Sequence, residues 1–298
     1  MDILRTPDER FEALPDYDFA PHYVEDLPGY AGLRGHYLDE GPADAKEVFL
    51  CLHGQPTWSY LYRKMIPVFT AAGVRVVAPD WLGFGRSDKP VDDAVYDFHY
   101  HRSYMLALIR RLDLTNITLV CQDWGGILGL TFPVDMPERF SRLLVMNTAI
   151  MATPVKSAAF DSWKAFVASN PDVPVETVMK KAEPAIQDAE AAAYAAPFPD
   201  PRYKAGVRRF PELVATTEGV EGIDVSRQAL RFWQNDWRGQ SFMAIGMQDA
   251  MLGPDVMRPL QGIIRGCPAP MEVAESGHFV QEHGEAVAER ALAAFGLA

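Results

Sequence analysis

Two segments of the sequence carry side chains that could act together in a substitution at carbon. In the first, the apolar run Ile117–Cys121 leads into Asp123, and Gly125 and Gly126 follow. A strand that turns sharply into a helix is typical of a nucleophile elbow, which raises one side chain above the edge of a sheet. A carboxylate is ionised at neutral pH, so Asp123 could attack a tetrahedral carbon and form a covalent ester. The second segment contains His278, a candidate base.

Asp123 has an alternative, purely structural interpretation as the N-capping residue of the following helix, because aspartate is common at that position. The glycine at position 125 favours the elbow, since a small residue there lets two backbone segments approach closely. We therefore predict that Asp123 is the nucleophile. The N-terminus of the following helix would favour its negative charge.

The base is predicted from the position of one histidine among seven. Only His278 lies in a Gly-His loop after the last apolar run, Met271–Ala274. A fold with a nucleophile elbow places its base in that loop, and the order of nucleophile, acid and histidine along the chain agrees. His53, at the end of another strand, is better interpreted as a buried structural histidine.

An acid must orient the imidazole of the base and stabilise its cation. The loop after Leu143–Met146 offers Asn147 and Thr148 but no carboxylate. The loop after the next predicted strand contains Asp249, which we predict to be the acid. Asp255 is the alternative, although Gly253-Pro254-Asp255 is more typical of a helix start. Main-chain N–H groups of Gln55 and Trp124 are the predicted oxyanion donors.

Alternation of apolar runs with helical patterns places these residues in one α/β fold. Continuous apolar runs are typical of strands that are covered on both faces, so a mostly parallel sheet flanked by helices is expected. The predicted strands are Val48–Leu52, Val74–Ala78, Ile117–Cys121, Leu143–Met146, Phe242–Gly246 and Met271–Ala274, with one or two antiparallel strands around Tyr30–Glu40. The predicted helices are Tyr60–Ala72, His99–Leu112, Ile127–Met136 and Glu285–Phe295. His99 and His101 are expected in a surface helix.

The alternation stops between residues 151 and 225, where alanine-rich and amphipathic patterns predict helices only. We therefore expect a core of residues 1–150 and 226–298, with residues 151–225 as an inserted helical cap. The formal net charge of −12 argues against nucleic acid and anionic membranes as partners. Three scattered cysteines form no metal-binding pattern, and no apolar stretch reaches the length of a membrane span. A cytoplasmic monomer is the default expectation.

These motifs together resemble those of haloalkane dehalogenases. The resemblance is carried by His53–Tyr60 (HGQPTWSY), Gln122–Gly126 (QDWGG) and Gly277–Phe279 (GHF). The acid at Asp249 and the segment Ala191–Pro199 (AAAYAAPFP) resemble the subfamily that contains the 1,2-dichloroethane enzyme. The resemblance covers nearly the whole chain and implies an α/β-hydrolase fold with an inserted cap.

The resemblance also implies a halide site and a hydrolytic reaction. Trp124 and Trp163 would donate indole N–H groups to the halide, while Phe160 and Ile127 would line the pocket. The substrate would be a small haloalkane, which water converts to alcohol, halide and a proton with neither metal nor organic cofactor. Gln55 stands where the 1,2-dichloroethane enzyme has an acidic residue, and Ile127 stands where it has a bulky aromatic residue, so the pocket is expected to differ.

Two other functions fit parts of the pattern. An epoxide hydrolase would share Asp123, Asp249 and His278 but would need acids, such as Tyr194 or Tyr203, to protonate an alkoxide. Halide needs no such proton, which favours dehalogenation. A non-catalytic binding protein on this fold would be expected to lack a member of the catalytic set, whereas every member is present here.

Overall fold

The apolar runs of the sequence form the middle of an eight-stranded sheet with the order β10-β9-β8-β7-β4-β5-β3-β2. The structure is a computed structural model that describes residues 1–298. The strands of this sheet are β2 (His22–Val24), β3 (Gly35–Glu40), β4 (Val48–Leu52), β5 (Arg75–Pro79), β7 (Ile117–Cys121), β8 (Phe140–Met146), β9 (Gln240–Gly246) and β10 (Met271–Val273). Two short strands, β1 (Ile3–Leu4) and β6 (Lys89–Pro90), form a separate antiparallel pair.

The sheet is parallel from β5 through β4, β7, β8 and β9 to β10. Only β3 and β2 run antiparallel to their neighbours. All residues of β4 and β7 are buried, as expected for strands covered on both faces. The predicted antiparallel strand near residues 30–40 is β3, whereas its partner β2 lies earlier in the chain than predicted.

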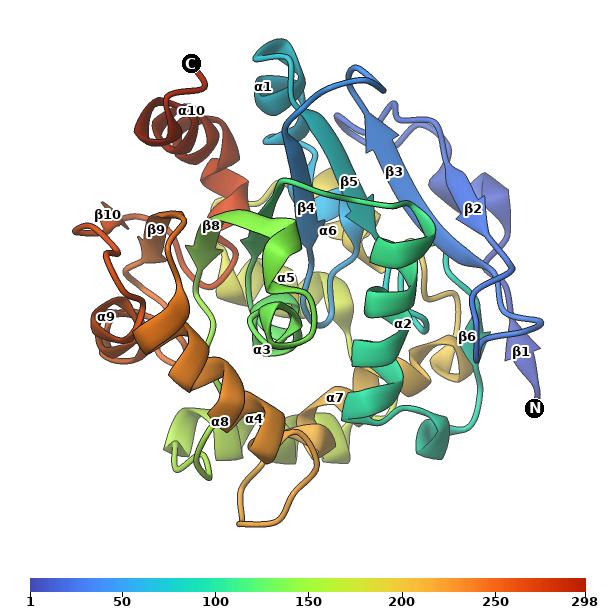
Figure 1. Ribbon diagram of the computed structural model, residues 1–298. Coiled ribbons are helices and arrows are strands. Elements are labelled where there is room, and N and C mark those ends of the chain that lie inside the picture. Colours follow the sequence, from blue (N-terminus) through green and yellow to red (C-terminus); the bar gives the residue numbers. More distant parts are fainter.

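Helices cover both faces of the sheet, which confirms the predicted α/β class. Helices α1 and α10 lie on one face, and α2, α3, α8 and α9 lie on the other (Figure 1). The helices are α1 (Ile66–Ala71), α2 (Phe98–Arg111), α3 (Trp124–Gly129), α4 (Ala158–Ser169), α5 (Val175–Ala182), α6 (Asp188–Ala195), α7 (Ala205–Leu213), α8 (Ile223–Arg231), α9 (Pro254–Ile263) and α10 (Gly284–Phe295). None is long and apolar enough to cross a membrane.

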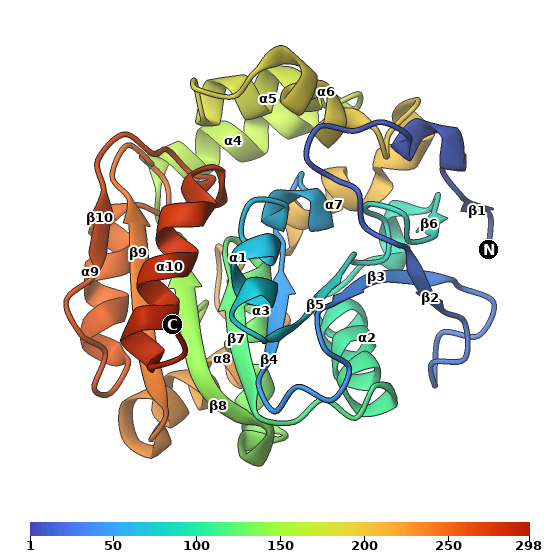
Figure 2. The same ribbon diagram turned by 90° about the horizontal axis from the view of Figure 1, so that it is seen from above.

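Five α-helices, α4 to α8, lie between β8 and β9, and we call the first four, α4 to α7, the insertion helices. Helices α4, α5 and α6 lie together beyond the end of the sheet toward which the arrows of β4 and β8 point (Figure 2). They therefore cover the edge at which Gln55 follows β4 and Asp123 follows β7. The predicted boundary at residue 225 falls inside α8, so the exact division into core and cap stays a prediction.

A buried ion network joins the insertion helices to the core. Arg63, whose side chain is fully buried, donates at 2.7 Å to Glu190 on α6 and at 2.7 Å to Glu282. Lys64 contacts the same two carboxylates, and the hydroxyl of Tyr194 donates to Glu282. Because Glu282 lies in the 3₁₀ turn Val280–His283, the network connects α6 with the chain that follows His278.

We predict that replacing Arg63 by methionine destabilises the protein by about 3 kcal/mol, because two nearly buried carboxylates lose their main partner. The midpoint of thermal unfolding should fall by several degrees. The control is Arg258→Met, which removes an exposed pair with Glu272 and should change stability by less than about 0.5 kcal/mol. Equal midpoints for the two variants would contradict a stabilising role of the network.

Candidate active site

Asp123 lies at the junction of β7 and α3 with a backbone that is unusual for a non-glycine residue. Its φ and ψ angles are 51° and −128°. Although Asp123 precedes the first residue of α3, its side chain forms no capping hydrogen bond. Its Oδ1 instead accepts the main-chain N–H of Gln55 at 2.8 Å. The N-cap alternative is therefore wrong, and the strained turn presents a carboxylate to the loop after β4.

Two glycines permit this close approach. A Cβ atom at Gly54 would lie 2.2 Å from Oδ1 of Asp123, and a Cβ atom at Gly125 would lie 2.0 Å from the carbonyl oxygen of Leu52. Both distances are shorter than non-bonded atoms tolerate. The loop after β4 and the first turn of α3 can therefore pack together only with glycine at these positions, which is how Gln55 reaches Asp123.

The structure brings His278 and Asp249 together, although 28 residues of chain separate them. The imidazole Nδ1 lies 2.7 Å from Oδ2 of Asp249, and Nε2 lies 3.6 Å from Oδ2 of Asp123. Asp255, the alternative acid, is exposed in the first turn of α9. Of the two carboxylates considered from sequence, Asp249 is the one that contacts the histidine.

Asp249 is held by a shell of donors that sequence reasoning missed. Asn147, which follows β8, donates at 3.0 Å to the same Oδ2 atom that contacts His278. The main-chain N–H groups of Met251 and Leu252 donate to Oδ1 at 2.8 and 3.1 Å. The amide of Asn147 also forms two hydrogen bonds with Gly246 at the end of β9. The sequence predicts that Asn147 follows a strand, but it does not show which residues Asn147 contacts.

The charges of this cluster favour an imidazolium next to two carboxylates. Burial disfavours the charged ring, but the carboxylates of Asp249 and Asp123 outweigh burial and raise the pKa of His278 to about 10. Burial also disfavours the charged form of Asp249, yet contact with His278 holds the pKa of Asp249 well below its usual range. The cluster therefore favours a proton on His278 at neutral pH.

Gln122 is a further neighbour of the histidine that sequence reasoning did not single out. Its side chain is fully buried, and its Nε2 lies 2.8 Å from Nε2 of His278 and donates at 3.1 Å to the carbonyl oxygen of the same residue. The residue before Asp123 thus touches both the ring and the main chain of His278. His53 is buried as predicted, and its Nε2 accepts the main-chain N–H of Trp81.

Trp124 is fixed by an aromatic stack beneath the insertion helices. Its indole ring lies 4.5 Å from the ring of Phe210 on α7, and Phe210 lies 4.6 Å from His101. His101 is fully buried, which corrects the expectation of a surface position. Burial lowers the pKa of His101 to about 3, so this histidine is a neutral packing residue. Trp124, the first predicted halide donor, is thus held by Phe210 of the insertion, and Phe210 in turn packs on His101 of the core.

The tryptophan N–H groups divide into two classes. Four of the six tryptophans donate to acceptors within the protein: Trp58 to Ala193, Trp81 to His53, Trp233 to Leu130 and Trp237 to Ser241. The indole N–H groups of Trp124 and Trp163 have no protein acceptor. These two are the predicted halide donors, and a free N–H on an apolar ring is the donor that an anion in a dry pocket requires.

The remaining predicted site residues lie on the elements expected for them. Phe160 and Trp163 are on α4, and Ile127 is on α3 three residues after Trp124. Phe160 and Ile127 are buried, whereas Trp163 is half-buried and stacks on Phe166. The side-chain amide of Gln55 donates at 3.1 Å to the carbonyl oxygen of Val207 on α7. This bond accounts for a glutamine at position 55, and it links the loop after β4 to the insertion helix α7.

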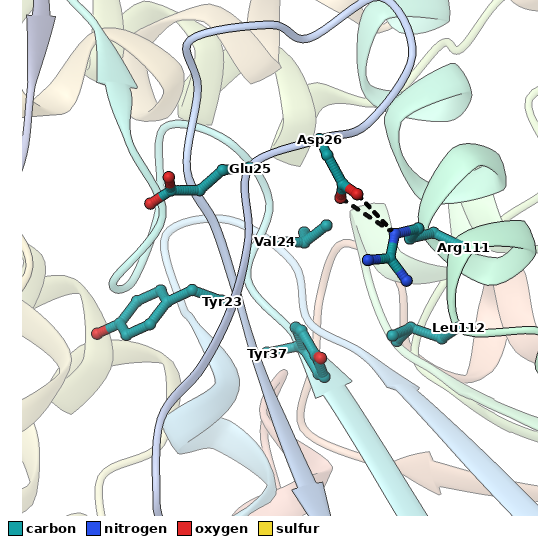
Figure 3. A pocket seen from close by; sticks show the side chains of 7 residues that line it. All are labelled: Tyr23, Val24, Glu25, Asp26, Tyr37, Arg111 and Leu112. Carbon is teal, nitrogen blue, oxygen red and sulfur yellow. Dashed lines mark hydrogen bonds and ion pairs between the residues drawn. The ribbon is translucent and has the colours of Figure 1, made fainter.

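A separate surface hollow contains none of these residues. It has a volume of about 300 Å³ and is lined by Tyr23, Val24, Glu25, Asp26, Tyr37, Arg111 and Leu112 (Figure 3). Arg111 and Asp26 pair across it at 3.0 Å, and both are exposed. Because Arg111 is already paired with Asp26 and none of the predicted site residues lines the hollow, we assign it no part in the chemistry.

Comparison with known proteins agrees with this geometry. Residues 47–285 match the family model for the alpha/beta hydrolase fold. The chain is 44% identical to a haloalkane dehalogenase of Psychrobacter cryohalolentis, with 97% of this chain and 96% of the relative covered. It is 41% identical to a haloalkane dehalogenase of Mycolicibacterium paratuberculosis, with 98% of each covered.

A solved structure extends the likeness to the whole backbone. The haloalkane dehalogenase DpaA from Paraglaciecola agarilytica, described as tetrameric, superimposes with a TM-score of 0.96 at 53% identity, and 99% of each chain is covered. The fold, the approach of Asp123, Asp249 and His278, and these full-length similarities lead to one conclusion. The chain belongs to the haloalkane dehalogenases, enzymes of the α/β-hydrolase fold that hydrolyse carbon–halogen bonds to an alcohol, a halide ion and a proton.

Proposed function

We propose that Asp123 opens the reaction by attacking the halogen-bearing carbon of a small haloalkane. The observation that carries this assignment is the contact of its two oxygens with different groups: Oδ1 accepts the N–H of Gln55, while Oδ2 faces His278. With Oδ1 held, Oδ2 is the oxygen that forms the new bond to carbon. The carbon–halogen bond breaks with its electron pair on the halide, and Asp123 becomes an alkyl ester.

Hydrolysis of that ester is the second step. His278 takes one proton from water while the water oxygen attacks Cγ of Asp123. The bond from Cγ to the alkoxy oxygen then breaks, this oxygen takes up the second proton of the water and leaves as the alcohol, and Asp123 is again a carboxylate. The N–H of Gln55 already lies at the oxygen that would bear the negative charge, which supports its role as an oxyanion donor. The main-chain N–H of Trp124 is the proposed second donor. Asp249 would stabilise the imidazolium that forms.

Ester formation itself would activate the base. In the free enzyme two carboxylates raise the pKa of His278, so its ring carries a proton and cannot act as a base. Alkylation turns Asp123 into a neutral ester and removes one of the two charges that raise this pKa. The pKa of His278 must then fall, and the ring can lose its proton before water attacks. Alkylation would therefore have to precede hydrolysis, because only alkylation lowers the pKa of His278 enough for the ring to act as a base.

Trp124 and Trp163 are the proposed halide donors, and residues 151–225 are the proposed cap that keeps them dry. Two free indole N–H groups on apolar rings stabilise a leaving halide more than they stabilise the bound substrate, which is differential binding of the transition state. Of the two acids considered for an epoxide hydrolase, Tyr194 is not free, because its hydroxyl donates to Glu282 in the buried ion network.

Two finer expectations concern the state of the protein in the cell. A monomer was the default expectation from sequence, whereas the relative DpaA is tetrameric. Because the two chains share 53% identity over nearly their whole length, we propose that this chain also self-associates, and light scattering of the purified protein distinguishes the two states. Cytoplasmic location stays a prediction.

We predict that the purified protein releases bromide from 1,2-dibromoethane and 1-bromobutane, and that Asp123→Ala releases none. The variant retains the pocket but lacks the oxygen that bonds to carbon. Halide release is measured over time at neutral pH. Equal release by both proteins would refute Asp123 as the nucleophile, whereas turnover of styrene oxide in the absence of bromide release would favour an epoxide hydrolase.

A second prediction concerns the halide site. Trp163→Phe should weaken bromide binding by about ten-fold, because a hydrogen bond to an anion contributes about 1.5 kcal/mol or more. Bromide affinity is measured by quenching of the remaining tryptophan fluorescence. The control is Trp237→Phe, whose N–H is occupied by Ser241 and which should bind bromide as the wild type does. Unchanged affinity in Trp163→Phe would remove this residue from the halide site.

The pKa of His278 gives a third prediction. Since the carboxylate of Asp123 raises this pKa, its removal in Asp123→Ala should lower the pKa from about 10 toward the ordinary value of 6.5. NMR titration of the ring Cε1–H signal measures the change. The control is Asp255→Ala, which removes an exposed carboxylate in the first turn of α9 and should leave the titration unchanged. A pKa that stays the same or rises in Asp123→Ala would contradict the proposed activation of the base.

A further inference from the structure

The loop that carries His278 is held from two sides. It connects β10 to the 3₁₀ turn Val280–His283 and has no regular structure of its own. On the core side, the main-chain N–H of Gln248 donates at 2.9 Å to the carbonyl oxygen of Ser276. On the other side lies the end of α5, where the carbonyl oxygen of Ala182 accepts the main-chain N–H of His278 at 3.3 Å. One side of the proposed base loop is thus supplied by the insertion.

A buried carboxylate makes the strongest contact between α5 and this loop. Glu183 follows the last residue of α5 and is fully buried. Its Oε2 accepts the main-chain N–H of Gly277 at 2.8 Å and the hydroxyl of Ser276 at 3.2 Å. Its Oε1 has no hydrogen-bond partner and lies 3.5 Å from Nε2 of His283. An ionised acceptor binds an N–H group about twice as strongly as a neutral one does.

Only glycine fits at position 277 in this contact. A Cβ atom at this position would lie 1.9 Å from the carbonyl oxygen of Ala182 and 3.6 Å from Oε2 of Glu183. The absence of a side chain lets the loop rest directly on the end of α5. The residue before the histidine is therefore fixed by backbone packing and by the carboxylate together, and its N–H has no other acceptor.

We propose that Glu183 is a positioning residue that sets the placement of His278 and thereby the rate of ester hydrolysis. The proposal rests on the role of His278 as the base. Without the carboxylate, the buried N–H of Gly277 would be unsatisfied, and the loop would have to move to find a new partner. Alkylation depends on Asp123, Gln55 and the proposed halide donors Trp124 and Trp163. The side chain of Glu183 forms no hydrogen bond with any of them. The effect therefore falls on the second step and not on the first.

The test separates the two steps in Glu183→Ala. Rapid mixing with 1,2-dibromoethane, followed by acid quench and mass spectrometry, gives the rates of formation and decay of the alkyl-enzyme. We expect formation at the wild-type rate and decay slowed roughly ten- to a hundred-fold, as for a catalytic group displaced by about 1 Å. Glu183→Gln retains an acceptor oxygen for Gly277 and should restore most of the decay rate, and it also serves if the alanine variant does not fold.

Two further variants make the result specific. Glu190→Ala loosens the insertion at Arg63 without touching residues 276–278, so its decay rate should match the wild type. His278→Ala should accumulate the alkyl-enzyme fully, and failure to do so would overturn the proposed base itself. If His278→Ala traps the ester but Glu183→Ala decays like the wild type, Glu183 has no positioning role. Equal slowing in Glu183→Ala and Glu190→Ala would also refute the proposal, because any loosening of the insertion would then suffice.

Discussion

Two carboxylates facing one buried imidazole are the interaction on which the rest of the structure depends. Asp249 and Asp123 lie 2.7 and 3.6 Å from the two nitrogens of His278, in a site where charge is costly unless it is paired. Asp249 stays ionised because Asn147 and main-chain N–H groups also satisfy it. The two carboxylates favour a proton on His278, so the loss of the charge of Asp123 that we propose for ester formation would favour release of that proton.

The parallel sheet explains how residues so distant in sequence meet. The carboxyl ends of neighbouring parallel strands lie at one edge of the sheet, and β4, β7, β9 and β10 each end there with one member of the site. The insertion helices close that edge from above. Their contacts are not confined to the substrate side: Phe210 supports Trp124, Val207 binds the side chain of Gln55, and Glu183 binds the loop of the histidine.

Features that depend on local sequence could be predicted, and features that depend on distant contacts could not. Strands β4 and β7 were predicted to the residue, because their apolar runs are bounded by turns and charged residues. The helix expected at Tyr60–Ala72 is instead a 3₁₀ turn followed by α1, which begins one residue before Pro67, and the helix after the elbow ends at Gly129 before Pro133. A proline fits only the first turn of a helix. The contacts of Asn147 and Glu183 could not be predicted, because their partners lie about 100 residues away in sequence.

The contact of Gly277 with the end of α5 limits how freely this protein could be recombined with its relatives. The core and the insertion look like exchangeable modules in the order of their elements. Yet the histidine loop belongs to the core by sequence and also forms three hydrogen bonds with the end of the insertion helix α5 and with Glu183. In a chimera of this core with another insertion, the buried N–H of Gly277 would lack a hydrogen-bond acceptor. Compatible pairs must therefore supply an acceptor for the N–H of Gly277 at the end of α5.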